Sequence, residues 1–183
     1  MRKIIYLILM LHLANILPPD AFAQEALPPR PSPLNVVRIK YQDNYLKIVY
    51  SQPHKQGRKI FGELVPYGKV WRTGANEATE ITFTRDIRVG TELLKAGTYT
   101  LFSIPQENQW TIIFNADLGL WGAYNYNDAK DVLRITAPVI ENERELYEPF
   151  TIRIDQQNDK AEIVFLWERV IVKLPLTLLQ TKS

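Results

Sequence analysis

The sequence contains no cysteine and only two histidines in 183 residues. The absence of cysteine excludes a disulfide framework, a thiol nucleophile and cysteine-ligated zinc or iron–sulfur sites. Two histidines leave little room for a histidine metal site, and no Gly-rich phosphate-binding loop is present. The formal net charge of +2 argues against a dedicated nucleic-acid-binding protein, which is normally strongly basic. The sequence therefore predicts no metal, no cofactor and no nucleic-acid partner.

The first 23 residues have the pattern of a secretory signal peptide. Arg2 and Lys3 precede an apolar stretch at 4–17, and Ala21–Ala23 has the A-x-A form of a cleavage site. The apolar stretch is shorter than the about 20 residues that a membrane span needs. We therefore predict cleavage between Ala23 and Gln24, a secreted or periplasmic location and no membrane span after cleavage.

The rest of the chain predicts a tether followed by one domain. Residues 24–34 include four prolines. Proline fixes φ and lacks an N–H donor, so this segment favours an extended polyproline conformation. Residues 35–178 are long enough for a single hydrophobic core, and we predict one domain there. Removal of residues 1–23 would also leave His54 as the one remaining histidine.

Short β-branched and aromatic segments, separated by turn signals, follow the tether. Val36–Lys40 and Tyr45–Tyr50 flank a turn at 42–44 and predict a hairpin. Since no window has a sustained apolar period of 3.6 residues, helices are not expected. The pattern predicts an all-β fold, an antiparallel β-sandwich of the jelly-roll type with roughly 8–10 strands. Two long loops are expected at 52–78 and 115–131. Further strands are predicted at 81–84, 87–89, 98–104, 110–114, 132–137, 150–154, 161–167 and 170–174.

Two distinctive strings lie in or beside these loops, WRTGANEAT at Trp71–Thr79 and WGAYNY at Trp121–Tyr126. With KAGTYTLFSIP from Lys95 and LWERVIVKLPL from Leu166, they make residues 36–176 resemble the bacterial secreted family called domain of unknown function 2911. The resemblance implies a single β-rich extracytoplasmic domain. It implies no reaction.

The first candidate site is the segment from Trp71 to Glu77. Arg72 can hold a carboxylate or phosphate through two hydrogen bonds, and Asn76 can orient a polar ligand. Glu77 is the candidate catalytic acid or base, a role that requires a solvent-reachable carboxyl with a raised pKa. The alternative is a buried structural network in which Arg72 pairs with Glu77 and Trp71 fills the core.

The second candidate is a basic loop between residues 54 and 72. Five cations and one anion, Glu63, occur there, so the loop can form a basic rim that attracts anionic ligands. Arg58 is the member that we expect to be ordered, and a solvated loop is the alternative. The cations are Lys55, Arg58, Lys59, Lys69 and Arg72.

The third candidate is the aromatic string at 121–126. Tyr124 and Tyr126 are spaced by two, so in an extended loop they share one face. Such rings, with Trp121, can stack on a sugar. They can equally form a hydrophobic lid over the core.

These patterns favour binding over catalysis, because no thiol and one histidine remain. The prediction is a protein that binds a small polar or anionic ligand or a glycan at one end of the sandwich. One alternative is a hydrolase or isomerase that uses Glu77 as acid or base and Arg72 as electrostatic stabiliser. Another is a structural envelope module without a ligand. The predicted ligand-binding residues are Arg58, Trp71, Arg72, Asn76, Glu77, Trp121, Tyr124 and Tyr126.

Overall fold

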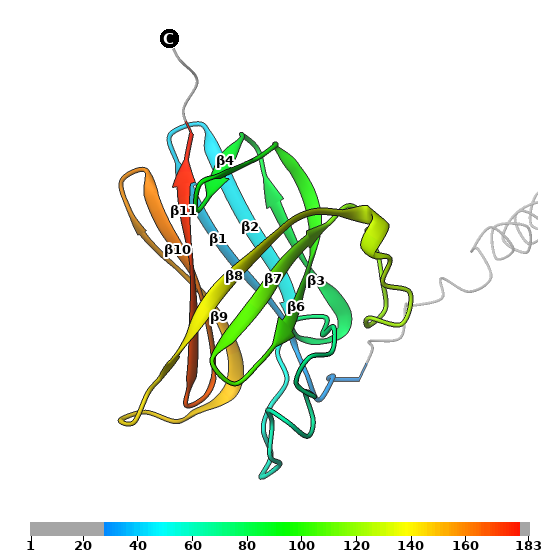
Figure 1. The fold of residues 1–183 in the computed structure, drawn as a ribbon. Helices are drawn as coiled ribbons and strands as arrows, with labels where there is room; N and C mark the ends of the chain where they lie inside the picture. The colour runs from blue at the N-terminus through cyan, green and yellow to red at the C-terminus, as the bar shows by residue number, and fades with distance from the viewer. Residues whose placement is uncertain (1–27, 180–183) are drawn as a thin grey trace, which may run out of the picture.

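The computed structural model describes residues 28–179, which form β-strands and one short 3₁₀-helix (Figure 1). The predicted signal peptide and its cleavage site lie outside the described residues. No helix within 28–179 is long and apolar enough to cross a membrane. The elements are β1 (Leu34–Tyr41), β2 (Asn44–Ser51), β3 (Ala75–Phe83), β4 (Ile87–Val89), β5 (Glu92–Leu94), β6 (Gly97–Pro105), β7 (Gln109–Asn115), η1 (Asp128–Lys130), β8 (Asp131–Glu141), β9 (Tyr147–Gln157), β10 (Lys160–Glu168) and β11 (Val170–Leu178).

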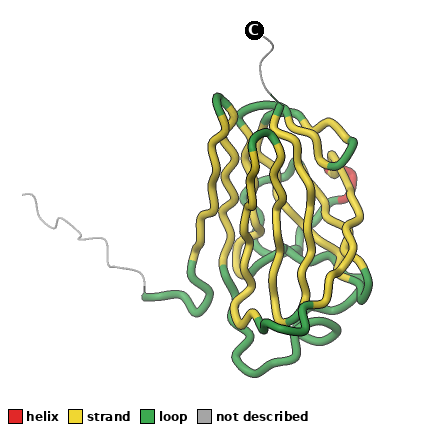
Figure 2. The backbone as a smooth tube through the Cα atoms, turned by 90° about the vertical axis from the view of Figure 1, so that its left-hand side faces the viewer, coloured by secondary structure: helices red, strands yellow, loops and turns green. Residues whose placement is uncertain are grey.

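The strands form one curved antiparallel sheet in the order β1-β2-β3-β6-β7-β8-β11-β10-β9, with β4 joining β11 and β5. The two ends of this path, β1 and β9, pack against each other. Figure 2 shows the strands side by side around the molecule. The prediction of an all-β antiparallel fold is confirmed. The sheet is nearly closed like a barrel, because successive strands pair along one path, and it does not separate clearly into the two layers of a sandwich.

Alternating residues of each strand fill the interior of this barrel. In β2, for example, Leu46, Ile48 and Tyr50 are buried while the residues between them are only partly covered. This period of two is the pattern that predicted strands from the sequence. The buried side chains make one continuous apolar core. The interior is therefore packed with the chain's own side chains.

The first long loop covers one end of the barrel. It runs from the end of β2 to the start of β3 and extends below these strands in Figure 1. Ile60, Phe61, Val65 and Trp71 from this loop are buried in the core. The loop ends at residue 74 rather than the predicted 78, because ANEAT begins β3. Sequence periodicity missed this start because the pairing of β2 with β3 shifts register between Val49 and Ser51.

The second long loop, residues 116–130, packs on the outer wall of the barrel. Leu120, Ala123 and Tyr126 cover a small cluster formed by Ala78, Phe102 and Ile113 of β3, β6 and β7. Phe102 and Ile113 point outward, whereas their strand neighbours Leu101, Ile112 and Phe114 belong to the interior core. The first loop therefore runs across an end and the second along the wall. They meet at this cluster, because Val70 of the first loop packs on it together with Leu120 and Ala123 of the second. The expectation that both loops form a single ligand site at one end stays a prediction.

Candidate functional site

The most exposed aromatic side chains of the predicted site lie on residues 118–124, which we call the aromatic turn. Trp121 is 58% exposed and Tyr124 is 84% exposed. The aromatic turn is fixed to β3 by its backbone. Leu120 O accepts from Ala78 N at 2.9 Å, and Gly122 N donates to Asn76 O at 3.0 Å. These bonds hold the exposed rings at a defined place on the wall.

Gly122 sets the position of the Tyr124 ring. Its φ is +70°, a region that side-chain-bearing residues rarely adopt. A Cβ at this position would lie 2.8 Å from Cε2 of Tyr124. The backbone therefore favours glycine, and a Cβ at this position would displace the Tyr124 ring. The same turn breaks the extended alternation that placed Tyr124 and Tyr126 on one face.

Tyr126 packs against the wall and takes no part in the exposed surface. Its ring lies edge-on to Phe102, with centroids 4.9 Å apart. Its hydroxyl donates to Asp131 Oδ2 at 2.5 Å and accepts from Arg134 Nη2 at 2.8 Å. Burial and the neighbouring Asp131 raise the pKa of Tyr126 to about 12. We call Tyr126, Asp131 and Arg134 the latch, because they fix the end of the loop to β8. The sequence interpretation missed Asp131 and Arg134.

Arg72 is half-buried and lies within electrostatic range of Tyr124. Its Nε is shielded from solvent and has no hydrogen-bond partner among the described residues. Burial lowers the pKa of the Arg72 guanidinium, and Tyr124 partly offsets this effect. A buried N–H without a partner costs free energy, on the order of 1–3 kcal/mol. Arg72 is thus a cation for which the described part of the chain supplies no counter-ion.

Glu77 pairs with Arg30 and not with Arg72. Nη1 of Arg30 lies 2.6 Å from Oε1 and 2.9 Å from Oε2 of Glu77, and Ser51 Oγ donates to Oε2 at 3.3 Å. The hydrogen bond from Arg30 is the main reason that the pKa of Glu77 is lowered. The predicted Arg72–Glu77 network is not formed. The raised pKa that a catalytic acid at Glu77 requires is also not found.

Residues 28–33, which we call the N-terminal strap, bring Arg30 to this position. Asn76 Nδ2 donates to Ser32 O at 3.4 Å, and Gln52 N donates to Pro33 O at 2.9 Å. The sequence interpretation treated these residues as tether only. A groove of about 240 Å³ lies beside the strap. It is lined by Leu34, Val49, Tyr50, Ser51, Glu77, Ala78, Glu80, Gly119 and Leu120.

Two predicted site residues lie away from the aromatic turn. Trp71 is part of the core, where its ring stacks on Trp167 at 5.8 Å and its Nε1 donates to Gly74 O. Arg58 is exposed in the loop across the barrel end and donates to the carbonyls of His54 and Lys55. Trp71 therefore serves packing, and Arg58 closes a turn.

The positive charge of the basic loop between residues 54 and 72 is partly neutralised by acidic residues that are distant in the sequence. Lys55 pairs with Glu168, and His54 lies 2.9 Å from Glu148. Backbone hydrogen bonds, together with His54, lower the pKa of Glu148. The net positive charge around the folded loop is thus smaller than the count along the sequence indicates.

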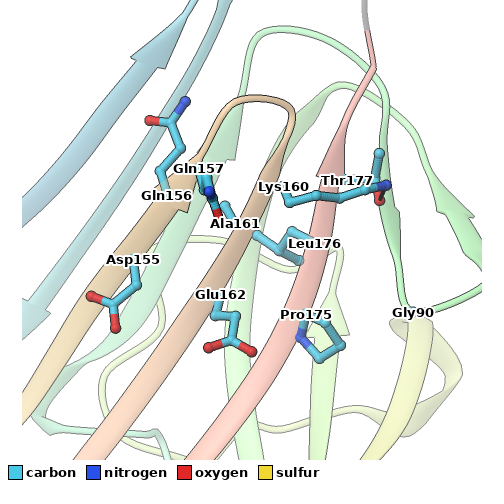
Figure 3. Close-up of a pocket in the computed structure, with 10 residues that line it drawn as sticks. All are labelled: Gly90, Asp155, Gln156, Gln157, Lys160, Ala161, Glu162, Pro175, Leu176 and Thr177. Atoms are coloured by element: carbon cyan, nitrogen blue, oxygen red, sulfur yellow. Dashed lines mark hydrogen bonds between the residues drawn. The ribbon is translucent and has the colours of Figure 1, made fainter.

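Two other hollows contain none of the predicted site residues. Figure 3 shows an open pocket of about 410 Å³ on the outer face of β9, β10 and β11. Its acids are paired, Asp155 with Arg153 and Glu162 with Lys173. The other, of about 590 Å³, lies at Tyr67, Gly68 and the turn between β6 and β7. No group of three or more potential metal ligands occurs within 28–179.

The structure therefore brings five of the predicted residues to one region of the wall. Trp121 and Tyr124 stand on the aromatic turn, Arg72 lies near Tyr124, and Asn76 and Glu77 bond or pair with the turn through their backbone.

Comparison with known protein families places most of the chain in one of them. Residues 32–176 match the family model described as "Protein of unknown function (DUF2911)". No curated protein and no solved structure matches the chain.

Proposed function

We propose that this chain, which belongs to the DUF2911 family, is an extracytoplasmic binding protein for a small ligand that carries an anionic group. The binding surface is Arg72 together with the exposed rings of the aromatic turn. The observation that carries the proposal is the half-buried Arg72 guanidinium, for which the described residues supply no counter-ion.

Arg72 has the properties of an anion-binding group that no acidic residue of the described chain occupies. Guanidinium groups bind carboxylates and phosphates through two parallel hydrogen bonds. Half of this side chain is already removed from water, so a ligand anion would meet less competition from solvent than at an exposed arginine. The anion would bind the outer Nη groups of the guanidinium, because Nε itself is shielded from solvent.

Binding is favoured over catalysis by the state of Glu77. Its carboxyl is held ionised by Arg30, with a lowered pKa, whereas a general acid near neutral pH needs a raised one. No other acid of the two distinctive strings is available, since Glu77 is the only one in them.

The test is thermal unfolding of the folded domain with a panel of carboxylates, phosphates and sugars. A ligand present at about 100 times its Kd should stabilise the domain by about 2.7 kcal/mol, which corresponds to about 5–10 °C in Tm. Arg72→Gln should abolish the shift without preventing folding. The matched control is Arg85→Gln, which removes the same charge at the other end of β3 and should leave the shift intact. An anion-dependent shift that survives Arg72→Gln would contradict the proposal, and so would a panel without any shift.

The extracytoplasmic location rests on the sequence pattern of residues 1–23. Fractionation of the native host, followed by N-terminal sequencing, should give a mature chain that starts at Gln24. A cytoplasmic protein that retains Met1–Ala23 would overturn this part of the proposal.

A further inference from the structure

The rings of the aromatic turn form an open platform on a backbone that is hydrogen-bonded to β3. Trp121 and Tyr124 face solvent, yet the backbone of their turn is bonded to β3 and the Tyr124 ring rests on Gly122. Exposed aromatic rings that are held in place lose little side-chain entropy when they bind. An open platform suits a ligand that has one apolar face and keeps its polar groups in water. A pyranose ring is such a ligand, because its C–H face packs on an aromatic ring.

Two of the arginines around the aromatic turn are paired with acids, and Arg72 is not. Arg30 is paired with Glu77, and Arg134 is paired with Asp131. Arg72 forms no ion pair among the described residues, and its Nε has no hydrogen-bond partner. Glu80 adds a carboxylate at the edge of the turn, since its Oε1 accepts from Gly119 N at 2.9 Å. The surface can therefore neutralise one negative charge, and a polyanion would meet nearby carboxylates.

From these two features we infer that the ligand is an acidic sugar, a pyranose unit that carries one carboxylate. This inference rests on the proposed function and narrows its ligand class. The carboxylate binds Arg72, the sugar ring stacks on Tyr124 and Trp121, and the hydroxyls remain in water. Nucleotides also stack on aromatic rings, but their phosphates carry more negative charge than one guanidinium compensates.

The test compares four probes that separate ring from charge. Glucuronate has both a pyranose ring and a carboxylate, whereas glucose has only the ring. Gluconate has the carboxylate and the hydroxyls on an open chain, and glucose 6-phosphate has a ring with a dianion. Titration calorimetry should show that glucuronate binds at least tenfold more tightly than each of the other three. Acrylamide quenching gives a second readout, because Trp121 is exposed while Trp71, Trp110 and Trp167 are buried. Bound glucuronate should reduce the quenching.

Variants test which residues bind the carboxylate and which bind the sugar ring. Arg72→Gln should leave glucuronate binding no more tightly than glucose. Trp121→Ala and Tyr124→Ala should each weaken glucuronate binding at least fivefold and leave gluconate unchanged. Tyr67→Ala removes an exposed ring elsewhere on the molecule. It is the control and should leave the affinity for glucuronate unchanged.

The outcomes separate this inference from the proposed function. If gluconate binds as tightly as glucuronate, or glucose 6-phosphate binds more tightly, the acidic-sugar inference is overturned while anion binding at Arg72 stands. If glucose binds as tightly as glucuronate, or no anion binds, both fall.

Discussion

Trp71 and Trp121 open the two distinctive strings of this chain, but they lie in opposite environments. Trp71 is 8% exposed and packs against Trp110, Trp167 and Phe150 at one end of the barrel. Trp121 is 58% exposed on the outer wall. The ring is the same, and only the neighbours differ. An aromatic residue in a distinctive string is therefore no guide to a binding site until its surroundings are known.

Substitution of each tryptophan by alanine should give the largest difference in the free energy of unfolding between the two positions. Trp71→Ala should lower the free energy of unfolding by about 3–5 kcal/mol, because it removes a ring from a closely packed core. Trp121→Ala should change it by no more than about 0.5 kcal/mol, because the ring is mostly in water. Urea unfolding curves measure both. A loss above about 2 kcal/mol for Trp121→Ala would show that its ring is needed for packing.

Gly122→Ala should destabilise the fold by about 1–3 kcal/mol, since it adds a Cβ at positive φ against the Tyr124 ring. The control is Gly119→Ala, where φ is +68° and no atom lies within 4 Å of the new Cβ. Both variants share the backbone strain, so the difference between their unfolding free energies measures the ring contact. Equal losses would mean that Gly122 does not position Tyr124.

Tyr126→Phe should cost about 1 kcal/mol, because it removes the hydroxyl of the latch. Tyr124→Phe is the control and should leave stability unchanged. The folded-state pKa of Tyr126, about 12, lies above the ordinary value of 10.0. The stabilisation is therefore complete below pH 10 and is lost as the pH rises through about 12. The free energy of unfolding, measured with urea between pH 9 and 12, should fall less steeply with pH for Tyr126→Phe than for the parent protein.

The smallest effect is expected at the N-terminal strap. Arg30→Ala should cost no more than about 1 kcal/mol at pH 7, because the ion pair with Glu77 is largely exposed. The pKa of Glu77 is lowered, so its contribution is present above the unfolded value and is lost as the pH falls through the folded one. Glu77→Gln should therefore flatten the loss of stability on acidification below about pH 4.5. An unchanged acid limb would show that the pair contributes nothing to folding.

The strands were predictable because their cause is local. Alternation in segments such as Tyr45–Tyr50 depends only on neighbours two residues apart, and the structure extends these segments by a few residues. The start of β3 was not predictable in this way. Asn76 has a φ of +54° beside the register shift between β2 and β3, and this irregularity interrupts the alternation.

The candidate site was predictable only in part, because its contacts join residues far apart in the chain. In the alternative interpretation of the sequence Glu77 pairs with Arg72, five residues away, yet its partner is Arg30, 47 residues away. One signal was present, since Arg30 is the only charged residue among the prolines at 28–33. The latch likewise joins the aromatic string to β8, and no local sequence pattern predicts this contact.

The sequence by itself determined the antiparallel all-β fold, the family and the exclusion of thiol chemistry, because these depend on composition, motifs and short-range periodicity. The tertiary structure decided that the sheet nearly closes into one barrel-like wall, that Trp71 is core and that Trp121 faces water. It also left Arg72 without a counter-ion beside Tyr124. These outcomes depend on which distant segments meet when β1 and β9 come together, and that information is spread over the whole chain.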